Sequence, residues 1–308
     1  MRFRKHSLWI ILSLISSACL LAQAPRVWTI QELFTRNVGT TEQQNKQFPP
    51  HKIIGNVYYV GTESLASFLV TTSQGLILIN TDYERNNAVI RDSITKLGFR
   101  PEDIKIILGS HAHGDHMEGD ALMKQQTGAQ VMAMAEDVQA LQGIRPGGKE
   151  HPIDRTLKDG EQVKLGDMTL TALLTPGHTN GCTTWTFKAQ EGGRTYDVLI
   201  IGSVGVNNGT NLVGDATRVA QYRQSFKVLR AQHVDVPLGS HPAMYNMAEK
   251  HAKLAAGGPN PYIDSKGYQD ELTIQETAFS NELKRQETEG PPTRGGGGGG
   301  GRGRGQQN

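Results

Sequence analysis

The stretch His111-Ala112-His113-Gly114-Asp115-His116 constrains the fold of this chain more than any other part of the sequence. It places four side chains that can bind a metal within six residues, directly after the apolar run Ile104–Leu108. An apolar run of this length that ends at Gly109-Ser110 predicts a buried β-strand, so the ligands are expected at the strand's end. Imidazole and carboxylate groups suit zinc, and a metal-ligand spacing of this kind rarely arises by chance.

Two further histidines occur in matching contexts. His178 follows the strand-like run Met168–Leu174, and His241 follows Val234–Val236. Five imidazoles and one carboxylate suffice for two zinc ions that each keep a position open for water, as catalytic sites do. The absence of any Cys-x-x-Cys pair argues against a zinc ribbon or finger. The remaining histidines lie in a leader or in polar segments and are expected to be ordinary: His6, His51, His151, His233 and His251.

The composition fits an exported globular enzyme. A chain of 308 residues with 37% hydrophobic content can bury a large core, and a net charge of +2 gives no reason to expect nucleic acid as a partner. The basic start, the apolar run Leu8–Leu21 and the small residues of Ala22-Gln23-Ala24 predict a signal peptide over residues 1–24. The protein is therefore expected in the periplasm, without a stable membrane span. A lipoprotein anchored through Cys19 is a minor alternative. Cys182 is expected to be a buried, inert thiol.

The chain beyond the leader predicts one domain over residues 25–290 and a disordered Gly/Arg-rich tail over 291–308. Strand-like runs are followed by an amphipathic helix from Tyr83 to Leu97 that Asp82 is expected to cap. A second group of strands and three more helices follow, after a long exposed loop over residues 142–155. This order fits a sandwich of two sheets with helices outside. The first group of strands is expected at Ile53–Val60, Leu65–Thr71 and Leu76–Asn80.

At this point the chain resembles the metallo-β-lactamase superfamily. His111–His116 matches its His-x-His-x-Asp-His motif, Pro176–Gly181 its second zinc motif, and Gly239-Ser240-His241 its last. The resemblance implies an α/β fold, a four-layer αββα sandwich of two mixed sheets with helices on the outer faces, and two zinc ions in a groove. It implies that the first zinc binds His111, His113 and His178, and that the second binds Asp115, His116 and His241.

The end of the run Val198–Ile201 bears on the substrate. Lactonases and glyoxalase II of this superfamily have an aspartate there that bridges both metals, whereas this chain continues Gly202-Ser203-Val204-Gly205, which is similar to subclass B3. Asn80 departs from the aspartate that many relatives have at the end of the third strand. The resemblance implies a zinc β-lactamase that hydrolyses penicillins, cephalosporins or carbapenems through a metal-bound hydroxide and confers antibiotic resistance.

In that reading the partner is a small-molecule β-lactam, and a monomer is favoured. Asp115 is then both a ligand and the catalytic residue that orients the nucleophile, while Ser203 and Asn207 contact the substrate carboxylate. An exported zinc hydrolase of the same fold that acts on lactones, other esters or thioesters remains the alternative. Ser93-Ile94-Thr95-Lys96 fits the Ser-x-x-Lys pattern of serine β-lactamases, but no accompanying motif is present. A non-catalytic zinc-binding or RNA-binding protein that uses the Arg/Gly tail is a third hypothesis.

Overall fold

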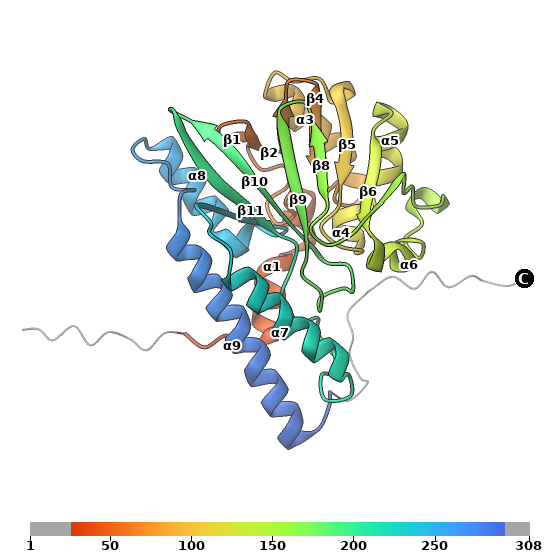
Figure 1. The fold of residues 1–308 in the computed structure, drawn as a ribbon, viewed down its shortest axis with the longest axis vertical. Helices are drawn as coiled ribbons and strands as arrows, with labels where there is room; N and C mark the ends of the chain where they lie inside the picture. The colour runs from red at the N-terminus through yellow and green to blue at the C-terminus, as the bar shows by residue number, and fades with distance from the viewer. Residues whose placement is uncertain (1–25, 293–308) are drawn as a thin grey trace, which may run out of the picture.

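Two β-sheets pack face to face, and helices cover both outer sides (Figure 1). The computed structural model describes residues 26–292, so the predicted signal peptide and nearly all of the predicted tail lie outside the described residues. The four-layer αββα sandwich predicted from the sequence is confirmed. Within residues 26–292, no helix is long and apolar enough to cross a membrane.

The first sheet has seven strands in sequence order. Its first four strands form an antiparallel meander, and the later ones are parallel to their neighbours. The strands are β1 (His51–Ile54), β2 (Val57–Tyr59), β3 (Phe68–Thr72), β4 (Gly75–Ile79), β5 (Ile104–Leu108), β6 (Gln130–Met134) and β7 (Arg155–Leu157).

The second sheet has five strands in the order β12-β11-β10-β9-β8. Only β11 and β12 pair in parallel. The strands are β8 (Gln162–Leu165), β9 (Met168–Leu174), β10 (Thr183–Glu191), β11 (Arg194–Ile201) and β12 (Val236–Gly239). Trp185 on β10 is 1% exposed, and its indole N–H donates to Gly109 O of the first sheet's β5 loop (3.1 Å). The main core therefore lies between the sheets and reaches the loops at one end.

The helices complete the outer layers. Helices α3 (Asn87–Lys96) and α5 (Asp120–Thr127) bury Ile90, Ile94 and Met123 on the outer face of the first sheet. Helices α7 (Ala216–Arg230), α8 (Met247–Ala255) and α9 (Ser265–Glu289) lie on the side of the second sheet (Figure 1). The N-terminal α1 (Ile30–Val38) begins with a capping box at Thr29 and packs on α9, and α2 (Thr41–Asn45) follows it. Two short helices belong to the loops, α4 (Gly114–Met117) and α6 (Val138–Leu141).

Two local predictions are wrong. The run Ile53–Val60 is not one strand but the hairpin β1–β2, because Gly55 takes a left-handed turn at φ +52°. Asp82 does not cap a helix; it has φ +55°, and its carboxylate accepts a hydrogen bond from Ser67 Oγ (2.9 Å). A 3-10 turn over Glu84–Asn86 precedes α3 instead.

Candidate metal centre

Three loops meet at one end of the sandwich. The first follows β5 and continues into α4, the second joins β9 to β10, and the third follows β12. A backbone hydrogen bond from Thr183 N to Ser110 O (2.7 Å) connects the second loop to the first, and one from Ser240 N to Ile201 O (3.0 Å) ties the third loop to the end of β11. Gly109 lets the Met117 side chain pack directly on the backbone, because a Cβ there would lie 2.2 Å from the Met117 sulfur. The ends of strands from both sheets thus position the predicted ligands.

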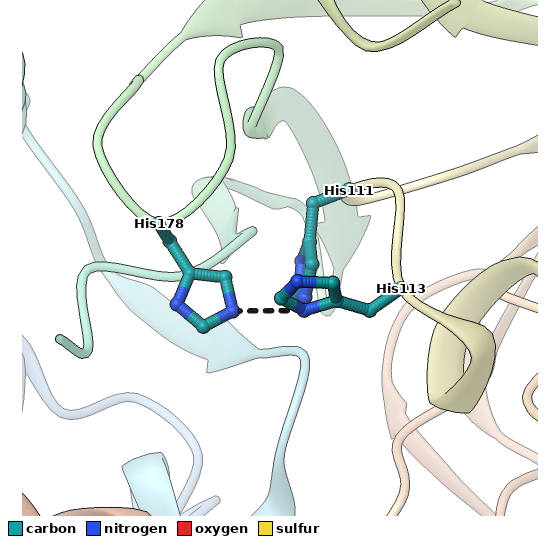
Figure 2. Close-up of side chains that lie close together, drawn as sticks. All are labelled: His111, His113 and His178. Atoms are coloured by element: carbon teal, nitrogen blue, oxygen red, sulfur yellow. Dashed lines mark hydrogen bonds between the residues drawn. The ribbon is translucent and has the colours of Figure 1, made fainter. Parts of the chain in front are cut away.

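Three imidazoles from two of these loops form what we call the histidine trio, namely His111, His113 and His178 (Figure 2). One nitrogen of each lies within 4.8 Å of the others. His178 Nε2 is 3.2 Å from His113 Nδ1. His111 Nε2 is buried and has no hydrogen-bond partner among residues 26–292. A buried polar atom without a partner is costly, so this arrangement calls for a cation.

A second group, the aspartate trio, adjoins the first and consists of Asp115, His116 and His241. Asp115 Oδ2 lies 3.3 Å from His116 Nε2 and 3.8 Å from His241 Nε2. The rings of His116 and His111 have centroids 4.2 Å apart, so the two trios are neighbours. The structure therefore brings together all six residues that the sequence predicted as ligands.

Hydrogen bonds behind the rings orient two of the imidazoles. His178 Nδ1 lies 2.7 Å from Gly205 O, and His241 Nδ1 lies 3.1 Å from Ser64 O. A carbonyl oxygen can only accept, so each Nδ1 donates its hydrogen, and the lone pair of Nε2 faces the centre of its trio. Metal-binding histidines are commonly held in this way.

The electrostatics suit a cation. Burial lowers the pKa of His111 and His178 well below the usual range, and it lowers the pKa of His241 to about 4. These imidazoles are neutral at neutral pH, which is the form that binds metals. Burial alone would raise the pKa of Asp115, but the adjacent His116 and His241 lower it overall. The donor set of five imidazoles and one carboxylate therefore fits zinc.

Two members of each trio line a cavity of about 1200 Å³, namely His113 and His178 of the histidine trio and Asp115 and His241 of the aspartate trio. Helix α1 forms an apolar wall with Ile30, Leu33, Phe34 and Val38. Two arginines lie on the polar side. Arg85 is stacked on the Tyr83 ring, with its guanidinium carbon 3.8 Å from the ring centroid, and Arg145 comes from the loop after α6.

Ser203 and Asn207, the predicted substrate contacts, also line this cavity. Ser203 is only 4% exposed, and its Oγ accepts a hydrogen bond from Gly205 N (3.3 Å). The Asn207 side-chain amide donates to His178 O (3.3 Å). Both side chains therefore help to hold the β11 loop as well as facing the site.

Asn80 supports the site in a way that the sequence did not reveal. Its Oδ1 accepts from Ser110 N (2.9 Å), and its Nδ2 donates to Ala66 O (3.1 Å). An aspartate cannot donate the second bond, so the amide at this position has a local structural reason. Sequence reasoning also missed Asp137, a buried acid whose bonds reach two of the ligand loops.

The other histidines of the described chain lie away from the centre. His51 and His151 are buried rather than solvated, and they bond to Tyr262 OH (2.6 Å) and Asp120 Oδ2 (3.0 Å) respectively. His233 has a side chain that is 77% exposed, beside Asp197. Burial raises the pKa of Cys182 well above its usual value, as expected of an inert thiol.

Known proteins with similar folds or sequences include several metallo-β-lactamases. A model of the metallo-β-lactamase superfamily matches residues 60–241. The FEZ-1 metallo-β-lactamase from Legionella gormanii is 45% identical, with a TM-score of 0.76 over 79% of this chain and 98% of that one. BJP-1, a subclass B3 metallo-β-lactamase of Bradyrhizobium japonicum, is 38% identical, with a TM-score of 0.75 over 80% and 98%. The class B3 di-zinc metallo-β-lactamase LRA-12 from an Alaskan soil metagenome is 29% identical, with a TM-score of 0.72 over the same shares.

Shorter matches point to a different hydrolase. A hydroxyacylglutathione hydrolase of Methylococcus capsulatus is 37% identical over 82 residues, which are 27% of this chain and 28% of that protein. Across the curated relatives of this name, the match spans 26% to 39% of their length.

Proposed function

Because the chain belongs to the metallo-β-lactamase superfamily and is most like its subclass B3, we propose that it is a zinc-dependent β-lactamase that confers resistance to β-lactam antibiotics. The observation that carries the proposal is the pair of adjoining trios that open onto one cavity through His113, His178, Asp115 and His241, in a fold shared with B3 enzymes over 98% of their length. The substrates proposed are penicillins, cephalosporins or carbapenems.

We propose that two zinc ions bind, one in the histidine trio and one in the aspartate trio. Each trio offers three protein ligands, which leaves room for water or substrate, as in catalytic rather than structural zinc sites. When bound, zinc supplies Lewis acidity, which polarises a carbonyl group and makes water more acidic.

Asp115 is proposed to orient the attacking water as well as to bind metal. In the overall reaction, water adds to the lactam carbonyl carbon, the C–N bond breaks, and one proton of the water ends on the nitrogen. The Asp115 carboxylate faces both His116 and His241 and also lines the cavity, so it can accept a hydrogen bond from that water. This role depends on where the Asp115 carboxylate lies relative to the water more than on its pKa.

Substrate binding is proposed to use both polar and apolar walls of the cavity. Ser203 and Asn207 face the side of the histidine trio and are suited to hydrogen-bond the carboxylate that β-lactams carry. The hydrogen of the Ser203 hydroxyl is not used in its bond with Gly205 N, in which Oγ accepts. The apolar wall of α1 provides surface for a ring substituent.

A thioester or lactone hydrolase of the same fold is the second candidate, and the matches to hydroxyacylglutathione hydrolases favour it. Those matches cover between 24% and 36% of this chain, against about 80% for the B3 structures. In addition, β11 ends in Gly202-Ser203, where the thioester and lactone hydrolases of the superfamily are expected to have a bridging aspartate. Both facts favour the β-lactamase.

The test compares substrates and metals in one set of assays. Purified mature protein is given nitrocefin, a hydroxyacylglutathione and an acyl-homoserine lactone, each with and without EDTA and then with zinc restored. Nitrocefin turnover that EDTA abolishes and zinc restores is expected. Asp115→Ala should lose this turnover, whereas Glu118→Gln, another acid on the cavity wall, should keep it. Zinc-dependent turnover of the thioester or lactone without nitrocefin hydrolysis would replace the proposal by the second candidate.

We also propose export to the periplasm through residues 1–24 and a monomeric enzyme in solution. Cell fractionation of the full chain, and of a chain that lacks residues 2–24, tests the first, with activity expected in the periplasm only for the full chain. Light scattering of the purified protein tests the second.

A further inference from the structure

A buried acid lies directly behind the histidine trio. Asp137, at the end of the 3-10 turn Ala135–Asp137 that follows β6, is 2% exposed. Its Oδ2 accepts from Ala112 N (2.9 Å) and from Thr179 Oγ1 (2.8 Å), and its Oδ1 accepts from Gly181 N (2.6 Å). Three hydrogen bonds therefore converge on one carboxylate.

The donors of these bonds are neighbours of the metal ligands in sequence. Ala112 stands between His111 and His113, while Thr179 directly follows His178. Figure 2 shows the three imidazoles and the two loops that supply them. The Asp137 side chain connects these two loops. The packing is close, because a Cβ at position 181 would lie 2.5 Å from Asp137 N. A shift of Asp137 would therefore move both loops.

Asp137 also has no cationic partner. Over residues 26–292, no lysine, arginine or histidine forms an ion pair with it. A buried carboxylate that lacks a counter-charge is expensive to keep, even with three hydrogen bonds. The histidine trio, for its part, consists of neutral ligands and leaves the charge of a divalent cation uncompensated. The aspartate trio contains its own carboxylate, so the two observations are complementary.

We propose that Asp137 is a positioning residue that sets the zinc affinity of the histidine trio in particular. It holds the two ligand loops at the separation that three imidazoles need, and it supplies the negative charge that their ligand set lacks. The inference rests on the zinc binding proposed above but not on β-lactams being the substrate. Outer partners of this kind commonly change metal affinity by about 10- to 100-fold.

The test measures zinc binding directly, by chelator competition on the purified mature protein, beside thermal unfolding of the zinc-loaded form. Asp137→Asn keeps the shape of the side chain but removes its negative charge. It also replaces one accepting oxygen by an NH₂ group, which cannot accept the hydrogen bonds that the carboxylate receives. One of two zinc-binding steps is expected to weaken by about 10- to 100-fold while the other stays within about threefold. Thr179→Val, which removes only one of the three bonds, should weaken the same step by a smaller factor.

Asp120→Asn is the matched control, because Asp120 is a fully buried acid whose bonds go to Thr81 Oγ1 (2.7 Å) and His151 rather than to the ligand loops. It should leave the affected zinc step as in the wild type. The inference is overturned if Asp137→Asn and Thr179→Val bind zinc like the wild type, or if Asp120→Asn weakens the same step equally. A wild-type protein that binds no zinc would overturn the inference together with the proposed function, whereas two bound zinc ions without β-lactam turnover would leave the inference standing.

Discussion

The stability of this protein is expected to depend on the protonation of His51, which is remote from the metal centre. His51 is 8% exposed and lies among aromatic rings, with centroids 5.6 Å from Tyr59 and 4.3 Å from His251. Its Nδ1 donates to Pro49 O (2.8 Å), so its Nε2 accepts from Tyr262 OH (2.6 Å). These bonds describe a neutral ring. Burial, opposed by the bond to Pro49 and assisted by His251, lowers the pKa of His51 from 6.5 to about 4.

The sign and size of the effect follow from linkage. Between pH 6.5 and 4 the unfolded chain binds a proton at His51 that the folded protein does not, so the free energy of unfolding falls as the pH falls. The whole interval corresponds to about 3 kcal/mol. On acidification from about pH 7.5 to about pH 5, His51 is expected to lower the free energy of unfolding by about 2 kcal/mol. Above pH 6.5 the contribution is fully present.

Urea unfolding at these two pH values, with saturating zinc, measures this contribution as a difference between variants. His51→Gln offers the same donor and acceptor without titrating, so it should lose about 2 kcal/mol less than the wild type on acidification. Other groups act equally in both proteins and cancel. His233→Gln, which alters an exposed histidine, should behave like the wild type. Equal pH dependence in the wild type and His51→Gln would refute the reasoning.

Three further predictions concern the site and its support. Asp115→Ala should lower kcat by on the order of 10²- to 10⁴-fold with KM within a few-fold, because its carboxylate orients the attacking water; steady-state kinetics that show a change in KM alone would contradict this. Asn80→Asp should cost about 1–3 kcal/mol in urea unfolding, because the fully buried side chain loses its bond to Ala66 O; an unchanged midpoint argues against it. Clavulanate, which acylates an active-site serine, should leave nitrocefin turnover unchanged, and progressive loss of activity with this inhibitor would count against a metal-dependent mechanism.

The sequence predicted the position of the candidate metal ligands best, because each group of ligands directly follows a β-strand in the chain. His111 to His116 follow β5 within a few residues, and His178 and His241 likewise follow β9 and β12. For such motifs the alternation of apolar runs and loops predicts both the element and the end at which the ligands lie. The αββα layers follow from the same pattern of strand and helix runs.

The parts that the sequence did not predict depend on contacts between distant segments. Nothing near Asp137 in the chain indicates that it bonds to residues 112, 179 and 181. The sequence predicts one strand over Ile53–Val60 because apolar residues flank Gly55-Asn56 on both sides, but a Gly-Asn pair is also a hairpin-turn signal, and here the left-handed φ of Gly55 forms that turn. Asp82 has the residue type of a helix cap, but burial beside Ser67 determines its role.

The apolar wall of the cavity and the two trios come from different parts of this chain. The apolar wall of the cavity belongs to α1, which precedes every metal ligand in sequence and contributes none of them. Arg36 of α1 and Glu271 of α9 form an ion pair with two hydrogen bonds. Glu271 also accepts a hydrogen bond from Gln275 Nε2 (2.7 Å), and Gln275 lines the same cavity. A largely buried ion pair of this kind fixes orientation more than it adds net stability. Because this ion pair holds the wall without touching the trios, we expect substitutions in residues 30–38 to change which substrate substituent fits while the proposed zinc binding stays intact.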